Sequence, residues 1–191
     1  MDIMERIFYA GIEEFRDYGI KFTMDGLASR LGISKRTLYE SISSKEKVVE
    51  LVIDRTFADI KKQQKEILDD EEQKTDEKIK KLLSIIPSYS DMIDYRQVIE
   101  IGKVYPKLYK KIEDGIEGDW EATISLLEKG IEEGMIRPYS LVIIKELFCL
   151  AFERLLDGRF LIRNGITYDK ALEEVTEILF NGILVVPEED R

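Results

Sequence analysis

The sequence predicts an all-α fold, with a small N-terminal helical unit followed by a larger helical domain. Residues 23–47 read as short helices separated by a glycine turn and by hydroxyl caps. From residue 44 onward, apolar residues recur at helical spacing, and no alternating strand pattern of useful length interrupts them. We expect the two domains to comprise residues 1–46 and 47–191.

The first two helices are predicted from an amphipathic start and a hydroxyl cap. The opening stretch, MDIMERIFYAG, is amphipathic and contains acidic residues. The hydroxyl of Thr23 can cap a second helix. Apolar residues follow at the spacing i, i+3, i+4, i+7, namely Met24, Leu27, Ala28 and Leu31. Gly32 can adopt the left-handed conformation at little steric cost, so we expect it to end that helix.

A third helix is expected after Ser34, which can cap it. Leu38 and Ile42 lie one turn apart and point inward. The opposite face is then basic and aromatic, with Lys35, Arg36 and Tyr39. Two short helices joined by a tight glycine turn are typical of a helix-turn-helix that reads DNA.

A fourth helix is predicted to start beside the third. Ser43 and Glu46 have the spacing of a capping box, so we expect Ser43 to cap this helix. Its N-terminal amides and Lys45 would then face the same surface as the third helix.

The residue types on this surface suit major-groove recognition. Arginine and lysine can bond the O6 and N7 atoms of guanine, while hydroxyls, lysines and helix N-terminal amides hold phosphates. Arg36 is the predicted base reader, and Lys35 could contact a base or a phosphate. Phosphate contacts are expected from Thr37, Tyr39 and Lys45, and Thr23 could offer its hydroxyl and the amides behind it.

These residues also have structural interpretations. Thr23 and Ser43 could act as caps alone. The three cations could be ordinary solvated charges, as scattered lysines and arginines are on any surface. Tyr39 could be a half-buried packing ring. The functional interpretation is favoured because the cations and Tyr39 share the one face that a helix-turn-helix presents.

Over about fifty residues the chain resembles the DNA-binding domain of the TetR/AcrR family of bacterial and archaeal repressors. The matching positions are Ile7, Ala10, Phe15, Gly19, Thr23, Leu27, Ala28, Leu31, Gly32, Ile33, Ser34, Thr37, Leu38, Tyr39, Ser44, Lys45 and Glu46. Ser41 stands where the family usually has a phosphate-contacting ring, and it remains a candidate DNA contact. Gly26 replaces a good helix former, at about 1 kcal/mol in an exposed helix interior. Asp25 lies where some members read a base; it could accept from cytosine N4 or sit favourably near the helix N-terminus.

Further helices are expected along the rest of the chain. The fourth helix should run to about Ile60 and fade into an exposed, charged segment before Thr75. The remaining predictions are a helix capped by Thr75 and kinked or ended by Pro87, a short helix over 91–102, a long helix over 106–133 closed by Gly134, and two last helices capped by Ser140 and Thr167.

The last two helices predict a homodimer. Their apolar stripes are wide enough to need more than one partner: Leu141, Ile144, Leu147, Phe148, Ala151, Phe152 and Leu155 in one, and Ala171, Leu172, Val175, Ile178, Leu179 and Ile183 in the other. The alternative is that both stripes are buried within one monomer. In the family, these helices pair with their copies as a four-helix bundle. Such a two-fold dimer would set two reading helices about 34–36 Å apart on a near-palindromic operator.

The resemblance also implies a small-molecule effector held among the middle helices. Its identity is open and could be a drug, a lipid or an acyl metabolite. Candidate lining residues are Tyr89, Met92, Tyr95, Tyr105, Trp120 and Phe148, with an acid such as Glu100 or Asp94, although core packing is the favoured role for each one taken individually.

Composition narrows the function classes. The formal net charge of −10 argues against a general nucleic-acid coat, yet residues 26–50 hold 5 basic and 3 acidic side chains. The chain has no histidine, which removes imidazole catalysis, the common zinc sites and the Glu-x-x-His di-iron arrangement. We therefore expect no enzyme activity, metal or cofactor. Cys149, the one cysteine, is expected to pack as a small hydrophobe.

Taken together, these features predict a ligand-responsive transcriptional regulator, specifically a repressor. No apolar run approaches the roughly 20 residues of a membrane span, and the N-terminus does not resemble a signal peptide, so a cytoplasmic protein is expected. Two alternatives remain. An all-helical enzyme would need a buried carboxylate cluster. The second alternative is a helix-turn-helix-derived protein-interaction adaptor without DNA binding, which Ser41 and the overall acidity keep open.

Overall fold

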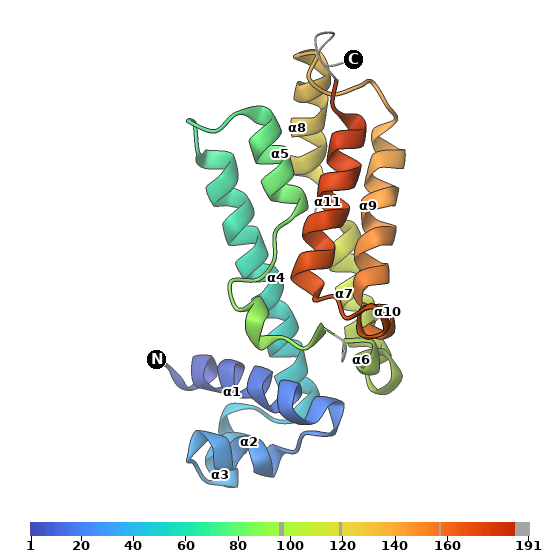
Figure 1. The fold of residues 1–191 in the computed structure, drawn as a ribbon. Coiled ribbons are helices and arrows are strands. Elements are labelled where there is room, and N and C mark those ends of the chain that lie inside the picture. Colours follow the sequence, from blue (N-terminus) through green and yellow to red (C-terminus); the bar gives the residue numbers. More distant parts are fainter. Residues whose placement is uncertain (96–97, 119, 157, 186–191) are drawn as a thin grey trace.

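The all-α fold class is confirmed. The computed structural model describes residues 1–95, 98–118, 120–156 and 158–185. Within these residues the chain is built from helices, and its only bridge-type pairing is an isolated contact between Ile136 and Leu184. A small unit of three helices lies at one end of an elongated molecule, and α4 rises from it into a larger bundle (Figure 1).

The N-terminal unit forms as the local signals predict. Its helices are α1 (Ile3–Tyr18), α2 (Met24–Leu31) and α3 (Lys35–Ser41), with a 3-10 turn, η1, at Gly19–Lys21. The hydroxyl of Thr23 accepts from the Gly26 amide at 3.0 Å, and that of Ser34 accepts from the Thr37 amide at 3.1 Å. Gly32 ends α2 with a φ of 66°, in the left-handed region. The helix-turn-helix therefore has both of its predicted caps and its predicted turn.

Helix α4 (Lys45–Asp69) differs from expectation at both ends. Ser44, not Ser43, is the cap, and its hydroxyl accepts from the Lys47 amide at 3.2 Å. Ser43 is exposed, so the prediction that it caps the helix is wrong. The helix also continues nine residues beyond Ile60. Residues 61–69 are mostly polar and mostly good helix formers, and Lys78 holds the end of the helix by donating to the Leu68 carbonyl at 2.8 Å.

The middle of the chain also differs in detail. Helix α5 (Thr75–Leu83) is preceded by Lys74 at the cap position, so Thr75 is not the cap; it is buried in the first turn. The helix ends well before Pro87. The predicted helix over 91–102 is replaced by a 3-10 turn, η2 (Ser90–Met92), and by α6 (Val98–Val104), and residues 96–97 of that prediction lie outside the described residues.

The predicted long helix over 106–133 is divided into α7 (Pro106–Gly118) and α8 (Glu121–Glu132). Gly118 is a weak helix former, and the buried Trp120 donates its indole N–H to the Ile116 carbonyl at 2.9 Å. This core contact anchors the chain where α8 begins. Residue 119 lies outside the described residues.

Three helices complete the fold: α9 (Leu141–Leu156), α10 (Gly158–Asn164) and α11 (Tyr168–Ile183). Ser140 directly precedes α9, and the Thr167 hydroxyl caps α11 by accepting from the Lys170 amide at 3.3 Å. Helix α10 was not predicted. Helices α9 and α11 lie side by side at the edge of the bundle (Figure 1).

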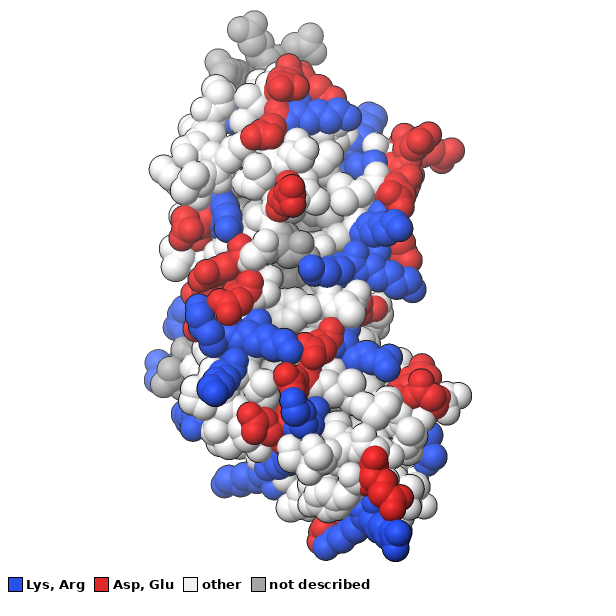
Figure 2. Space-filling model, turned by 180° about the vertical axis from the view of Figure 1, so that it is seen from behind, with Lys and Arg blue, Asp and Glu red and all other residues white. Residues whose placement is uncertain are grey.

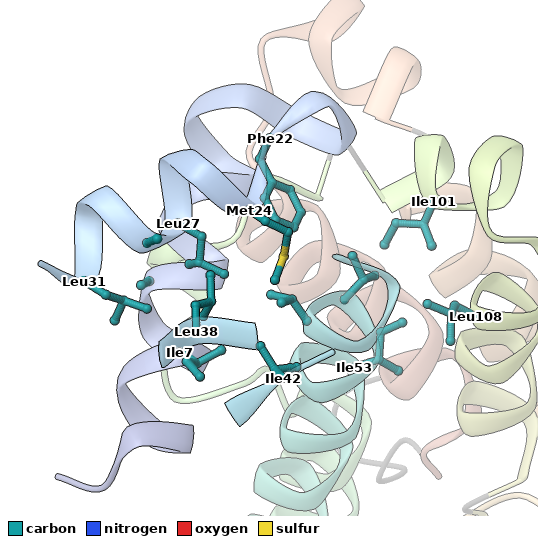
Figure 3. Packing of buried hydrophobic residues seen from close by; sticks show 14 residues of the cluster. Ile7, Phe22, Met24, Leu27, Leu31, Leu38, Ile42, Ile53, Ile101 and Leu108 are labelled. Atoms are coloured by element: carbon teal, nitrogen blue, oxygen red, sulfur yellow. The ribbon is translucent and has the colours of Figure 1, made fainter. Parts of the chain in front are cut away.

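One hydrophobic cluster joins the N-terminal unit to the larger domain. It contains Leu27 and Leu38 from the helix-turn-helix, Ile53 from α4, and Ile101 and Leu108 from α6 and α7. Figure 3 shows the α6 and α7 side chains on the far side of α4 from the reading helices. Because protein interiors are close-packed, a displacement of α6 or α7 would change the packing of the N-terminal unit. A second cluster around Leu127 and Phe148 fills the bundle.

Candidate nucleic-acid interface

Helix α3 presents the predicted residues to solvent. Leu38 is fully buried and Ile42 is nearly so, which fixes the orientation of the helix. On the opposite side, the side chain of Arg36 is 89 % exposed and Tyr39 is 50 % exposed. Tyr39 therefore has a free ring face at the surface while its helix is held by Leu38.

The two cations of α3 are paired with acids. Arg36 Nε lies 2.9 Å from Glu40 Oε1, one turn further along α3. Lys35 forms an ion pair with Asp25 at the start of α2. All four side chains are largely exposed. Such pairs contribute little to stability, so a phosphate or a base can replace the acid.

The hydroxyls of α3 bond within the helix. Ser34 and Thr37 share a hydrogen bond of 2.9 Å between their hydroxyl oxygens. Ser41 donates to the Thr37 carbonyl at 3.1 Å. Thr23, Thr37 and Ser34 are nonetheless exposed at the surface of the helix-turn-helix. Each hydroxyl oxygen keeps acceptor capacity, and rotation of the hydroxyl is what would let Ser41 or Thr37 donate to a phosphate.

Lys45 is turned into the domain. Its ammonium donates to the Ile20 carbonyl and lies 4.7 Å from the centre of the Phe22 ring. Burial lowers the pKa of this ammonium. Lys45 therefore joins the start of α4 to the turn before α2. The sequence predicted only a phosphate contact for Lys45, and this structural role was missed.

A four-residue charge cluster that joins α2 to α1 was missed from the sequence. Arg30 of α2 lies 2.8 Å from Glu14, 2.7 Å from Asp17 and 3.2 Å from Glu13, all on α1. Glu14 is only 3 % exposed. The hydrogen bond from Arg30 lowers the pKa of Asp17, and the hydrogen bond to Glu14 raises the pKa of Arg30. The spacing of the acids along α1 was the available signal, but their shared partner comes from another helix.

The surface charge is mixed over the whole visible face. Figure 2 shows lysine and arginine side chains interspersed with acids, including at the end formed by the N-terminal helices. The local excess of basic residues over 26–50 is therefore partly neutralised by Asp25 and by the acids of α1.

The predicted effector residues do not gather around one cavity. Tyr95 lines an apolar cavity between α1, α4, α6 and α7, and Trp120 lines a second cavity. Tyr89 packs edge-on against Phe8 and Tyr9 and donates to the Thr56 hydroxyl at 3.2 Å.

The other four effector candidates lie apart. Phe148 is fully buried in the second cluster, and Tyr105 packs against the first. Glu100 pairs with Lys103 on its own helix, and Met92 is half-buried in η2. Core packing thus accounts for Phe148 and Tyr105 better than ligand contact does.

Other kinds of site are limited as follows. In the part of the chain that the structure describes, no three histidine, cysteine, aspartate or glutamate side chains could jointly hold a metal ion. No helix within those same ranges is long and apolar enough to cross a membrane. Cys149 is buried, and burial raises the pKa of its thiol.

Residues 7–52 match the family model of bacterial regulatory proteins of the tetR family. An uncharacterized HTH-type transcriptional regulator, YvaF of Bacillus subtilis (strain 168), is 27 % identical over 186 residues, covering 97 % of this chain and 98 % of that protein.

Solved structures share the fold along nearly the whole chain. A putative transcriptional regulator from Saccharomonospora viridis in complex with choline has a TM-score of 0.71 at 16 % identity, covering 96 % of this chain and 98 % of that one. The regulator FadR from Bacillus subtilis in complex with stearoyl-CoA has a TM-score of 0.66 at 16 % identity, covering 94 % and 98 %. The match to the family model and the similarity to YvaF confirm the resemblance predicted from the sequence.

Proposed function

We propose that this TetR-family transcriptional regulator is a homodimeric repressor that binds a near-palindromic operator and is released by a small-molecule effector. The observation that carries the proposal is the outward face of α3, where Arg36, Lys35 and Tyr39 stand on a capped helix-turn-helix. No role in catalysis is proposed, and reading DNA assigns the protein to the cytoplasm.

In the proposed complex, Arg36 reads a guanine and Lys35 contacts a base or a phosphate. Thr23, Thr37, Tyr39 and Ser41 hold the phosphates and fix the register. Asp25 and Glu40 give up their cations when DNA arrives.

Lys45 has two roles in this proposal. It positions the turn before α2 through the Ile20 carbonyl, and it adds positive charge beside the reading helix. Ser41 supplies a shorter and weaker phosphate contact than the ring it replaces.

Exposed apolar side chains on the last two helices support the dimer. Val142 and Ile143 of α9 are 69 % and 60 % exposed, and Ile178 of α11 is 71 % exposed. Leu147 and Leu150 extend the same exposed surface along α9. Large apolar patches of this kind mark protein interfaces. A second copy of α9 and α11 would bury them in an isologous contact.

The proposed domain boundary between residues 46 and 47 falls inside α4, so one continuous helix runs from the first domain into the second. The N-terminal unit of α1, α2 and α3, which we call the reading unit, and the effector-binding domain share the first hydrophobic cluster. This cluster includes Leu38 of α3 and Leu108 of α7. An effector that changed the packing of α6 or α7 would therefore change the position of the reading helices. The relatives that bind choline or stearoyl-CoA support a ligand-responsive role for this domain.

Selection of bound fragments from the genome of the source organism, at two salt concentrations, tests the proposal. Enrichment of one near-palindromic sequence at the higher salt is the expected result. Enrichment without sequence preference, or no enrichment, would instead support the adaptor, which keeps the helix-turn-helix shape without reading DNA. The variant Arg36→Ala serves as the matched negative control.

A further inference from the structure

An apolar cavity of about 160 Å³ lies at the junction of the reading unit and the larger domain. Gly11, Ile12 and Phe15 of α1 form part of its wall, and Ile101 and Ile112 of α6 and α7 form another part. Helices α1 and α4 approach closely here, because a Cβ on Gly11 would come within 2.9 Å of Val48. Whatever fills this cavity therefore touches the reading unit directly.

The wall of the cavity carries no charged side chain among the described residues; its polar side chains are those of Thr56, Tyr95 and Tyr168. The Thr56 hydroxyl is already engaged, since it donates to the Val52 carbonyl at 2.8 Å and accepts from Tyr89. An isolated carboxylate or ammonium in such a site would lose its hydration without gaining a partner. The cavity therefore selects against charged molecules.

Tyr95 offers an unused polar group. Its ring stacks on Tyr168, with the centroids 3.9 Å apart, and its hydroxyl is buried with no hydrogen-bond partner among the described residues. The nearby Ser90 hydroxyl donates to Asp169 at 3.0 Å and keeps acceptor capacity, but no hydrogen bond joins it to the Tyr95 hydroxyl in this structure. Burial raises the pKa of Tyr95, so the hydroxyl stays protonated and can donate. Unpaired buried hydroxyls are rare because they are costly, and a ligand acceptor would remove that cost.

A second cavity, of about 130 Å³, adjoins the first. The two share Phe57, Ile60, Ile85, Ile116 and Tyr168 as wall residues. Phe57 is packed so closely over α7 that a Cβ on Gly115 would overlap its ring. A cavity of roughly 150 Å³ holds a molecule the size of benzene. A larger occupant of the first cavity must therefore extend past these shared side chains into the second.

We propose that the two cavities together bind one elongated, uncharged and mainly apolar molecule, whose single hydrogen-bond acceptor pairs with the Tyr95 hydroxyl. This inference rests on the proposed function, because it assigns the chemical class of the effector. The occupant separates α1 from α6 and α7, so it acts on the reading unit without an intermediate element.

Calorimetric titration of the full chain with straight-chain probes tests the ligand class. 1-Octanol is expected to bind saturably with one molecule per chain, and its affinity should exceed that of 1-butanol by about three- to fourfold for each added methylene. Octanoate at neutral pH is expected to bind at least tenfold more weakly than 1-octanol. Equal or tighter binding of octanoate, or affinities that level off at four carbons, would overturn the inference.

The hydroxyl is tested with a pair of matched variants. Tyr95→Phe should weaken 1-octanol binding by about three- to tenfold and leave benzene binding unchanged. Tyr105→Phe removes a hydroxyl from a residue outside both cavity walls and should change neither. Equal loss in both variants, or in neither, would contradict the assignment to Tyr95.

Fluorescence anisotropy with the selected operator separates this inference from the proposed function. Release of operator by 1-octanol, but not by octanoate, is the expected result. If the protein binds its operator, but no probe binds the protein or releases the operator, the proposed ligand class is wrong and the proposed repressor function is unaffected. If no operator is found but 1-octanol binds with Tyr95 dependence, the site stands and the proposed function fails.

Discussion

The buried carboxylate of Glu14 lies directly against Gly26, where a Cβ would come within 2.8 Å of Glu14 Oε2. Glycine at this position departs from the family pattern, and the contact gives the reason. Glu14 is held in place by Arg30, whose Nε lies 2.8 Å away, so it cannot move aside without weakening that pair. The glycine allows α2 to pack closely on the charged part of α1.

Gly26→Ala is therefore expected to destabilise the protein by about 1 kcal/mol or more, although alanine is the better helix former. The midpoint of thermal or urea unfolding measures this. Gly118→Ala is the matched control, because Gly118 is also helical and a Cβ added there would have no neighbour within 4 Å. That control should be neutral or slightly stabilising. A stabilised Gly26→Ala would show that Glu14 gives way easily.

The Arg30 cluster predicts acid sensitivity of the reading unit. The hydrogen bond from Arg30 lowers the pKa of Asp17 below its ordinary value of 3.8. A lowered carboxyl pKa contributes stability above the unfolded-state pKa, and that contribution is lost as the pH falls through the folded-state value. Urea unfolding of the wild type and of Asp17→Asn should therefore differ at pH 6, and the difference should shrink below pH 3.8. A constant difference would mean that Asp17 acts by packing alone.

Arg36→Ala is expected to weaken specific operator binding by about 1–3 kcal/mol and to relax preference at one base pair. Competition binding against operator variants measures both effects. Glu40→Gln provides the opposite test, since it removes the acid that lies 2.9 Å from Arg36 Nε. It should tighten binding and steepen the salt dependence. Wild-type behaviour of both variants would move the reading surface elsewhere.

Substitution of Lys45 distinguishes its structural role from its electrostatic role in DNA binding. Lys45→Ala removes the donor to the Ile20 carbonyl and is expected to cost about 1 kcal/mol of stability. It should also weaken binding to all DNA sequences and reduce the salt slope by about one, because one cation near the phosphates is lost. Unfolding and DNA titrations at several salt concentrations measure the two effects separately. Reduced stability with an unchanged salt slope would assign Lys45 a structural role only.

Local signals predicted the helix-turn-helix well. Thr23, Ser34 and Thr167 cap the helices that follow them, and Gly32 has the expected left-handed conformation, because each depends on neighbours within a few residues. The choice of Ser44 over Ser43 could not be decided locally, since adjacent serines offer the same hydroxyl.

Tertiary contacts account for what the sequence did not reveal. The break between α7 and α8 depends on the burial of Trp120, and the cluster around Arg30 joins residues far apart in the chain. The apolar cavity lined by Tyr95 also depends on how the helices pack against one another. Of the seven predicted effector residues, Tyr95 alone lines it, because helical spacing says which side chains point inward but not where the helices leave space.

Ile178→Asp tests the dimer at its most exposed apolar residue. Ile178 is 71 % exposed on α11, whereas Ala171, Leu172 and Ile183 of the same predicted stripe are buried, so a charge at Ile178 lies outside the monomer core. In an isologous interface each substitution appears twice. The dimer would therefore bury two carboxylates against apolar side chains, with no cation to pair with either one. Sedimentation is expected to show a monomer, and operator binding should fall because a single reading helix covers only one half-site.

Val104→Asp, at a similarly apolar and exposed residue on α6, is the control and should leave the dimer intact. Dissociation by Val104→Asp and not by Ile178→Asp would place the interface on α6 instead of α9 and α11.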